Sequence, residues 1–518
     1  MANWLKNAVF YEIYPQSFQD SNGDGIGDLQ GIIDRLDYIQ ELGCNAIWMN
    51  PCFDSPFSDA GYDVRDYYTI APRYGTNEDA KRLFAEVHKR GMHILLDLVP
   101  GHTSIDHAWF RESMKADPNA YSKRYIWTDQ IWEGFDGVQN IAGALRGISD
   151  RDGSCAVNFY TTQPALNYGF AKMTRPWQSA VDSEEATQTR LAMQDIMDFW
   201  LGLGCDGFRV DMAGSLVKQD EDGQATVALW QKITGFLKDK YPEAALVSEW
   251  GEPDKSLNGG FDMDFVLHFG PSHYLELFRL EHPYFAKEGK GDVSAFVKRY
   301  VECQQAAQGQ GLICIPSSNH DMPRISLCLD EDERKLAFAF LLSMPGAPFI
   351  YYGDEIGMRY LEGIRSVEGG YNRTGTRSPM QWDNGVNAGF SAAAPDKLYI
   401  MLDPDADRPT VQSEMARADS LYHEVKKLIA LRQSVEVLQS EAPVTFLYAE
   451  ECAYPFVYRR GTEGDSVLVV LNPSGEDAVC TLPEPVTAAD VLYSCGGVAE
   501  VVDGQVRAPG ASVTFFRC

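Results

Sequence analysis

The sequence predicts a (β/α)8 TIM barrel with an inserted subdomain and a C-terminal antiparallel β domain. Apolar segments with strand character alternate with helical segments, which predicts a parallel sheet covered by helices. Eight such units are present, and eight is the count of a TIM barrel. One long polar stretch interrupts the alternation, and a different, purely strand-like pattern begins past about Val435.

The eight predicted strands are short and largely apolar, as expected for a sheet buried on both faces. They are predicted at Val9–Tyr14, Asn45–Asn50, His93–Val99, Gly207–Met212, Ala245–Trp250, Asp264–Phe269, Leu312–Ser317 and Pro348–Tyr352. Among the helices between them, three are marked by periodicity and by capping residues. These three are predicted from about Leu29 to Leu42, from Asn77 to Arg90 and from about Ser183 to Leu203.

Residues 103–174 form the predicted insertion. They are rich in Trp, Tyr, Asp, Asn and Gly and show little periodicity. A structureless loop of this length is unusual in a compact domain, so a folded subdomain is expected. The predicted boundaries are therefore 1–102 and 175–435 for the barrel, 103–174 for the subdomain, and 436–518 for a C-terminal β-sandwich.

Charge and composition restrict the partners. The 518 residues carry a formal net charge of −29, which argues against nucleic acid and anionic membranes because no basic excess exists to replace phosphate counterions. No apolar run of about 18 residues and no signal-peptide pattern are present. The 11 Cys lack CxxC pairs. We therefore expect a cytoplasmic protein with reduced thiols and a small neutral substrate; the pattern does not give the oligomeric state.

The segment from Gly207 to Met212 carries the first chemical signal. Arg209 and Asp211 are two residues apart on a predicted strand, so both side chains project to one face. A guanidinium beside a carboxylate holds that carboxylate ionised. The pair is either a structural ion pair that fixes the strand or an ionised nucleophile.

Further polar groups follow other predicted strands. The carboxyl ends of barrel strands build the active site of this fold, so Asp211, Glu249 and Asp321 are expected to share a cleft. Like charges at short range separate their pKa values, leaving one carboxyl charged and another protonated. That combination is what cleavage of a glycosidic bond requires. The alternative is that these are solvated loop carboxylates.

Four segments at these strand ends resemble the α-amylase family of glycoside hydrolases, on its oligo-1,6-glucosidase and α-glucosidase side. They are Asp97-Leu-Val-Pro-Gly-His102, Gly207-Phe-Arg-Val-Asp211, Val247-Ser-Glu249-Trp and Ser318-Asn-His-Asp321. Their order and placement match the family, and Tyr11-Glu-Ile-Tyr-Pro15, Gly61-Tyr-Asp63 and Arg377-Ser-Pro-Met-Gln-Trp382 add to it. The resemblance covers roughly residues 8–435.

The resemblance implies a retaining mechanism in which Asp211 is the nucleophile, Glu249 the acid and base, and Asp321 the transition-state stabiliser. The two reacting carboxyls should then lie about 5–5.5 Å apart. The residue pattern agrees, because Arg209 favours a charged Asp211 and the apolar flanks Val247 and Trp250 favour a protonated Glu249.

The family also implies substrate contacts. Arg209 orients the nucleophile, and His102 and His320 bind hydroxyls of the sugar. Asp63 and Arg373 resemble the pair that closes the non-reducing end of the pocket in exo-acting α-glucosidases. The alternatives are an Asx-turn residue for Asp63 and a surface charge for Arg373. Met212 matches neither linkage pattern of the family, so linkage preference stays open.

The loop Asp20-Ser-Asn-Gly-Asp-Gly-Ile-Gly-Asp28 has the oxygen spacing of a Ca²⁺ site. The position where an EF-hand has its bidentate glutamate is Gly31, so a structural calcium site outside an EF-hand is predicted; an Asp/Gly turn without an ion is the alternative. The predicted ligands are Asp20, Asn22, Asp24, the Ile26 carbonyl and Asp28. Gly101 stands where the family often has a calcium-binding Asn, which makes a second site doubtful.

Four functions compete. The first is a retaining hydrolase of short α-glucosides. The second is a transglycosylase or isomerase, such as a trehalose synthase or a sucrose-active enzyme. The third is an endo-acting amylase, which the predicted pair of Asp63 and Arg373 disfavours. The fourth is a catalytically inactive binding protein on the same barrel, which would lack the three carboxylates that this chain has.

Overall fold

The computed structural model describes residues 1–484, 486 and 488–518, and it contains the predicted barrel. The eight parallel strands are joined in the order β11-β10-β9-β8-β5-β2-β1-β12. A parallel bridge from Pro316 to Phe349 closes the ring between its two end strands. The strands are β1 Phe10–Ile13, β2 Ala46–Met49, β5 His93–Leu98, β8 Gly207–Val210, β9 Ala245–Ser248, β10 Met263–Phe265, β11 Leu312–Cys314 and β12 Phe349–Tyr351.

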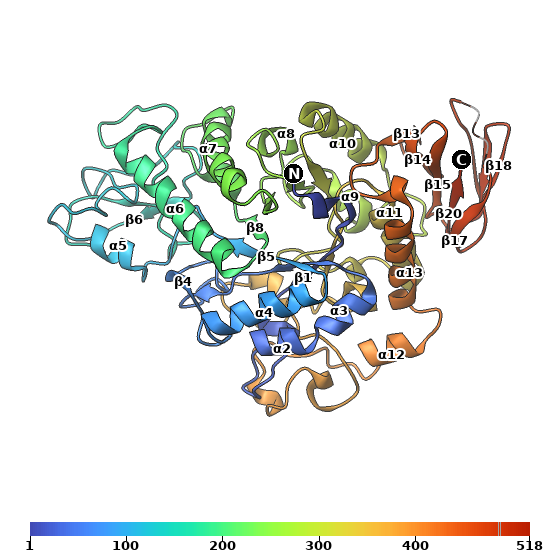
Figure 1. The fold of residues 1–518 in the computed structure, drawn as a ribbon, viewed down its shortest axis with the longest axis horizontal. Helices are drawn as coiled ribbons and strands as arrows, with labels where there is room; N and C mark the ends of the chain where they lie inside the picture. Colours follow the sequence, from blue (N-terminus) through green and yellow to red (C-terminus); the bar gives the residue numbers. More distant parts are fainter. Residues whose placement is uncertain (485, 487) are drawn as a thin grey trace.

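Helices surround this ring and pack on its outer face (Figure 1). Those of the barrel region are α1 Pro15–Phe18, α2 Leu29–Asp34, α3 Leu36–Leu42, α4 Asn77–Lys89, α6 Glu184–Leu203, α7 Gln224–Lys240, α8 Pro253–Ser256, α9 Tyr274–Phe278, α10 Ser294–Ala307, α11 Glu331–Ser343, α12 Val411–Ala416 and α13 Leu421–Ser434. The helix predicted over residues 29–42 is two helices, because Arg35 leaves the helical conformation. Thr76, not Asn77, caps α4, since its side chain and that of Asp79 form a capping box.

The interior of the barrel has an apolar floor and a polar upper layer. Phe10 and Phe349 stack with ring centroids 4.2 Å apart inside an apolar cluster that Leu5 of the N-terminal 3-10 turn completes. Two residues further along the same face, the strands carry polar groups, as in the pairs Phe10/Glu12 and Leu95/Asp97. The floor thus supports a charged layer at the carboxyl ends of the strands.

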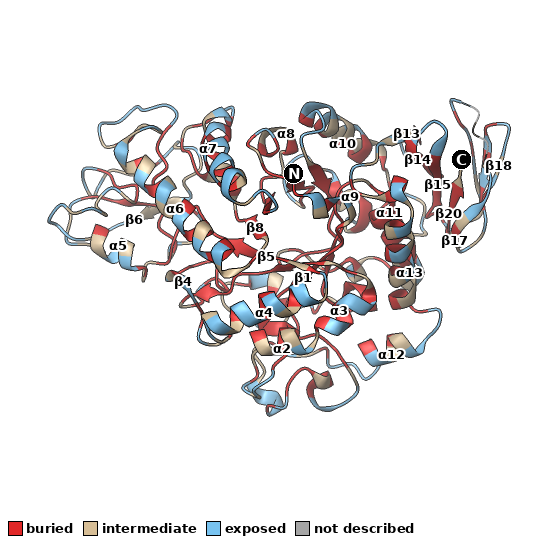
Figure 2. Cartoon of the chain, in the orientation of Figure 1, coloured by how far each residue is buried: buried red, intermediate tan, exposed pale blue. Residues whose placement is uncertain are grey.

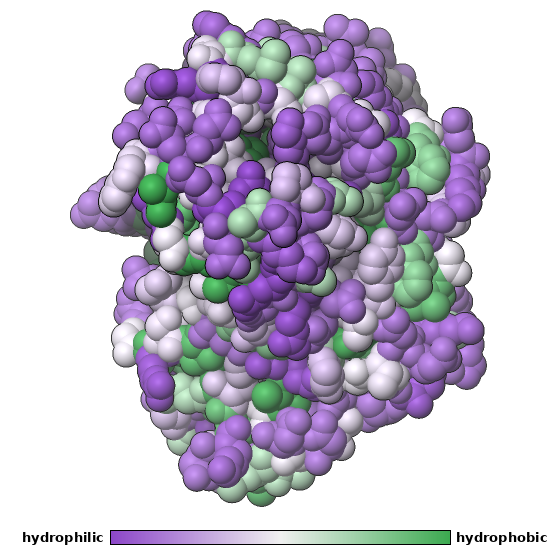
Figure 3. All heavy atoms as spheres, turned by 90° about the vertical axis from the view of Figure 1, so that its left-hand side faces the viewer, coloured by the Kyte–Doolittle hydropathy of each residue, from purple (hydrophilic) through white to green (hydrophobic). Residues whose placement is uncertain are grey.

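Between β5 and α6 the chain leaves the barrel and forms the projection at the left of Figure 1. This segment contains α5 Ala108–Ser113 and the antiparallel pair β6 Gly143–Leu145 and β7 Cys155–Val157, and it has its own small apolar core around Phe135 and Phe170. Its outer face is mostly hydrophilic with scattered apolar patches (Figure 3). A folded insertion is present, and its boundaries at residues 103 and 174 stay a prediction.

The C-terminal part lies at the other end of the long axis (Figure 1). A five-stranded antiparallel sheet, β13-β14-β15-β20-β17, and a three-stranded sheet, β16-β19-β18, share one apolar cluster that includes Val457, Val470 and Val506. The strands are β13 Val444–Tyr448, β14 Phe456–Thr462, β15 Asp465–Asn472, β16 Ala478–Thr481, β17 Val491–Cys495, β18 Glu500–Val502, β19 Gln505–Ala508 and β20 Ser512–Arg517. Helix α11 contacts β15 and β20 and joins this part to the barrel.

Burial follows the layers in Figure 2, with the barrel strands buried and the outer helix faces exposed. All eleven Cys are free, and Cys44, Cys205 and Cys314 are among the buried ones. Within the part of the chain that the structure describes, no helix is both long enough and apolar enough to span a bilayer. All eight barrel strands are shorter than predicted, and the difference at the carboxyl end is largest for β10: it ends at Phe265, and His268 and Phe269 line the pocket instead.

Candidate active site

A single guanidinium connects two of the three predicted catalytic carboxylates. Arg209 is 2% exposed and lies on β8. Its Nη1 lies 2.7 Å from Asp97 Oδ1 and 3.1 Å from Asp211 Oδ1, and its Nη2 lies 2.8 Å from Glu249 Oε1. Strand register accounts for the first contact, because Asp97 and Arg209 are direct neighbours across β5 and β8. Asp211 and Glu249 follow β8 and β9 and therefore face the same space.

The electrostatics of this pair differ from the sequence-based prediction. Burial raises the pKa of Asp211 well above its usual value, the neighbouring Glu249 carboxyl raises it further, and Arg209 opposes both. Arg209 does not single out Asp211, because it binds Asp97 and Glu249 as well. Glu249 also accepts the backbone N–H of Met212 at 3.0 Å. The two carboxyls thus compete for one cation, and at Asp211 the surroundings favour the protonated form.

Asp321 has the opposite environment. Burial alone would raise its pKa, but His320, Arg373 and Arg377 hold that pKa well below the usual range. Arg373 Nη1 and Arg377 Nη2 each lie 2.8 Å from Asp321 Oδ1. Asp321 is therefore the permanently charged carboxylate of the site.

His320 does not line the pocket. It is fully buried behind Tyr62, with Nε2 2.6 Å from the Tyr62 hydroxyl and Nδ1 2.8 Å from Glu12 Oε1. Tyr62 does reach the pocket and approaches Asp97 Oδ2 at 3.1 Å. Tyr62 thus lies between His320 and the cavity. In this arrangement His320 would affect a bound sugar only indirectly, through its hydrogen bond to the Tyr62 hydroxyl.

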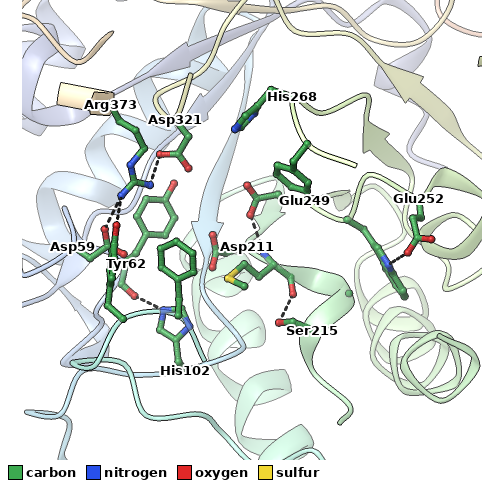
Figure 4. Close-up of a pocket in the computed structure, with 16 residues that line it drawn as sticks. Asp59, Tyr62, His102, Asp211, Ser215, Glu249, Glu252, His268, Asp321 and Arg373 are labelled. Atoms are coloured by element: carbon green, nitrogen blue, oxygen red, sulfur yellow. Dashed lines mark hydrogen bonds and ion pairs between the residues drawn. The ribbon is translucent and has the colours of Figure 1, made fainter. Parts of the chain in front are cut away.

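These groups surround a pocket of about 570 Å³ at the carboxyl ends of the strands. Figure 4 shows Asp211 and Glu249 in its centre, Asp59 and Arg373 at one end with Asp321 beside Arg373, and Glu252 at the other end. The residues that line it are Asp59, Tyr62, His102, Phe159, Tyr160, Asp211, Met212, Gly214, Ser215, Glu249, Trp250, Glu252, His268, Phe269, Asp321 and Arg373.

The prediction that Asp63 pairs with Arg373 is wrong. Asp63 is fully buried, and its carboxylate accepts the Ser55 hydroxyl at 3.0 Å and the backbone N–H groups of Ser58 and Asp59 at 2.9 and 3.0 Å. It holds a turn, which is the alternative that the sequence left open. The partner of Arg373 is Asp59, whose Oδ1 lies 3.5 Å from Arg373 Nη2.

The pair of Asp59 and Arg373 closes one end of the pocket. Asp59 Oδ2 accepts the Gln163 amide at 2.7 Å, and Arg373 Nη2 donates to the Tyr160 hydroxyl at 3.1 Å. Burial raises the pKa of Asp59 to about 6, and Arg373 opposes this. Every charged group at this end has a fixed partner, which gives the end a defined shape.

His102 lies in the pocket wall, where its predicted contact with a sugar hydroxyl stays a prediction, and residues far along the chain fix its ring. Asn158 Nδ2 lies 3.1 Å from His102 Nδ1, and Nε2 lies 3.1 Å from the Tyr62 carbonyl oxygen. Lys218 donates to Asn158 Oδ1 at 3.0 Å, and burial lowers the Lys218 pKa to about 7. A Cβ on Gly101 would lie 2.8 Å from Asn158 Nδ2, so Asn158 fills the space that Gly101 leaves.

Met212 lines the pocket from a left-handed backbone position (φ 43°) directly after Asp211. The other end of the pocket contains residues whose pocket position the sequence reasoning missed. Trp250 Nε1 donates to Glu252 Oε2 at 3.2 Å. His268 and Phe269 come from the segment that was predicted to be strand. The signal available for Trp250 and Glu252 was their position directly after Glu249.

The predicted calcium loop is compact and serves its own backbone. Its side-chain oxygens accept backbone N–H groups of the loop and of the first turn of α2. Asp20 accepts from Asn22, Gly23 and Gly25, and Asn22 accepts from Asp24. Asp24 accepts from Ile26, and Asp28 accepts from Ser21 and from Gly31 of α2. Over the described residues, no group of three or more His, Cys, Asp or Glu side chains converges as metal ligands would. Calcium binding at Asp20, Asn22, Asp24, Ile26 and Asp28 therefore stays a prediction.

Comparison with known proteins agrees with this geometry. Residues 12–441 match the family model for the α-amylase catalytic domain. The chain is 32% identical over 533 residues to an oligo-1,6-glucosidase of Bacillus sp. (strain F5), which covers 90% of this chain and 100% of that one. It is 30% identical over 540 residues to the trehalose synthase/amylase TreS of Mycobacterium tuberculosis (strain ATCC 25618 / H37Rv), covering 91% and 82%.

Among solved structures, the fold matches trehalulose synthase MutB from Pseudomonas mesoacidophila MX-45 with a TM-score of 0.81 at 25% identity, over 100% of both chains. It also matches a mutant of isomaltulose synthase from Erwinia rhapontici NX5 in complex with D-glucose, with a TM-score of 0.82 at 26% identity, over 100% of this chain and 99% of that one.

Proposed function

The chain belongs to the α-amylase family, and from this premise we propose that it is a retaining α-glucosidase of disaccharides and short oligosaccharides. The pairing of Asp211 and Glu249 on one guanidinium, beside a closed pocket end, carries this proposal. A pocket closed at one end admits one terminal glucosyl unit, with the scissile bond beside the two carboxyls.

In the first step, the Asp211 carboxylate attacks the anomeric carbon and the bond to the glycosidic oxygen breaks. Glu249 gives its proton to that oxygen, and the released sugar leaves as an alcohol. In the second step, Glu249 takes a proton from water as the oxygen of that water attacks the anomeric carbon and expels Asp211. Two inversions give net retention of the α-configuration.

The surrounding charges support both steps. The first step needs a charged Asp211 and a protonated Glu249, and the second step restores the proton of Glu249. Arg209 holds both carboxylates without choosing between them, so substrate binding determines which one carries the proton. Asp321, kept ionised by Arg373 and Arg377, stabilises the positive charge that develops on the sugar ring.

A second candidate is a transglycosylase or isomerase. The similarity to trehalose, trehalulose and isomaltulose synthases supports it, since it extends over at least nine-tenths of this chain. The covalent intermediate is the same in both functions, and a sugar hydroxyl replaces water in the second step. The closed end at Asp59 and Arg373 serves either reaction but not internal cleavage of long chains.

A substrate panel with product analysis tests the proposal. We expect release of glucose from maltose or isomaltose, with the α-anomer formed first, as followed by proton NMR. Conversion of trehalose, sucrose or maltose into an isomeric disaccharide without net glucose would favour the isomerase instead. Initial formation of β-glucose, or rapid loss of starch chain length without glucose, would contradict the proposed function.

A further inference from the structure

His268 occupies a place that neither the sequence reasoning nor the proposed mechanism uses. It lies three residues beyond the end of β10, in the segment before α9. Figure 4 shows its ring directed into the pocket between Asp321 and Glu249, on the side of Asp321 away from Arg373. That position is beside the scissile bond, toward the open end where the leaving sugar must lie.

Its ring has no protein partner to explain this position. The Nδ1 atom of His268 is enclosed by protein and has no hydrogen-bond partner among the described residues. The ring of His102, by contrast, has a partner at each nitrogen. Because His268 lines the pocket and Nδ1 is closed off from it, the other ring nitrogen, Nε2, for which no hydrogen bond is found among the described residues, is the atom that a substrate hydroxyl or a water can reach.

The chemistry of the ring suits a hydroxyl group. Burial lowers the pKa of His268, while Asp321 and Glu249 oppose this. A neutral imidazole presents either an N–H donor or an acceptor lone pair at Nε2, and a sugar hydroxyl can complement either one. Phe269 packs edge-on against it at 5.2 Å and is 46% exposed, so an apolar ring face lies beside the polar contact, as a sugar ring requires.

We propose that His268 is a specificity-determining residue that hydrogen-bonds a hydroxyl of the leaving sugar. The inference rests on the proposed function and deepens it: the preferred substrates are α-glucosides whose leaving group is itself a sugar. The residue acts at the open end of the pocket and leaves the bound glucosyl unit and the three carboxylates unchanged.

The test compares two substrates that share the glucosyl unit and differ in the leaving group. For His268→Leu, we expect kcat/KM on the best disaccharide to fall about tenfold, as for loss of one hydrogen bond, while kcat/KM on p-nitrophenyl α-glucoside stays within about twofold. His268→Asn restores a donor and an acceptor and should recover part of the disaccharide activity. The matched control is His273→Asn. His273 lies in the same segment between β10 and α9, but its ring pairs with Glu276 outside the pocket, so kcat/KM should stay unchanged on both substrates.

The outcomes separate two kinds of failure. An equal loss on both substrates, or no loss on either, with unchanged melting temperatures, would overturn the role of His268 while the proposed function stands. A wild-type protein that cleaves neither substrate would overturn the proposed function and, with it, this inference.

Discussion

The two ends of the pocket are built differently. At the closed end, Asp59, Tyr160, Arg373 and Asp321 are joined by ion pairs and hydrogen bonds, and Gln163 supports Asp59 from behind. At the open end, His268 has no hydrogen-bond partner for Nδ1 among the described residues, and Phe269 is 46% exposed. A fixed end can select one sugar stereochemically, whereas an end with unpaired groups waits for a ligand to complete it.

The reacting carboxylates lie between the two ends and act on every substrate, so their removal should have the largest effect on kcat. For Asp211→Asn we expect kcat to fall by about 10⁴-fold or more on disaccharides and aryl glucosides alike, because the nucleophile is lost. The melting temperature should not fall, since burial of the Asp211 charge opposes folding. Retained turnover, measured against a preparation free of wild-type enzyme, would remove Asp211 as the nucleophile.

The closed end should be the next most sensitive part. For Asp59→Asn we expect kcat/KM to fall by about 10²-fold on every substrate, because its ion pair with Arg373 shapes the site of the glucosyl unit. The matched control is Asp63→Asn, four residues away, which should lower the free energy of unfolding by about 1–3 kcal/mol through lost turn contacts and leave kcat/KM nearly unchanged. A larger loss of kcat/KM for Asp63→Asn than for Asp59→Asn would instead indicate that Asp63 binds the substrate.

This contrast shows where sequence reasoning succeeds and where it ends. The eight strands, and with them Asp97, Arg209, Asp211 and Glu249, follow from local alternation and the rule for barrel strand ends. Asp59 and Asp63 stand in one loop, and nothing in their spacing tells which one faces the cavity.

The choice between them depends on backbone turns. Phe57, Ala60 and Gly61 have φ values of 60°, 50° and 101°, a run of left-handed conformations that spacing does not encode. His268 was missed because an apolar run was extended past the true end of β10. Asn158 contacts His102 across 56 positions of the chain, and Lys218 contacts Asn158 across 60. Contacts over such separations exist only in the folded chain, so the sequence pattern did not reveal them.

The closed end should also respond to pH. Since the pKa of Asp59 is raised to about 6, the carboxyl gains a proton as pH falls through 6 and loses its attraction for Arg373. Competitive inhibition by glucose should therefore weaken several-fold between pH 7 and 5. For stability the sign is opposite: a raised carboxyl pKa favours the folded state in acid, and this contribution is lost as pH rises from about 4 to 6. The inhibition constant of glucose for Asp59→Asn should not vary with pH in this range. The same pH dependence in the variant and the wild-type protein would mean that another group causes it.

The smallest effect is expected at the predicted calcium loop, which supports the closed end from a distance. Gly25 of the loop accepts the Tyr399 N–H, the Tyr399 hydroxyl donates to Glu368, and Glu368 precedes the Gly369 carbonyl that accepts from Arg373. If the loop binds calcium, chelation should lower the melting temperature by a few degrees, because an ion bound only to the folded state stabilises it. Asp24→Asn should lower it similarly and abolish the response to chelator. We expect kcat and KM to stay constant under chelation, because the ion pairs of Asp59, Arg373 and Asp321 hold the closed end without the ion. A rise in KM on calcium removal would show that the calcium loop is needed to hold the closed end in place. An unchanged melting curve with no bound metal would refute the calcium prediction.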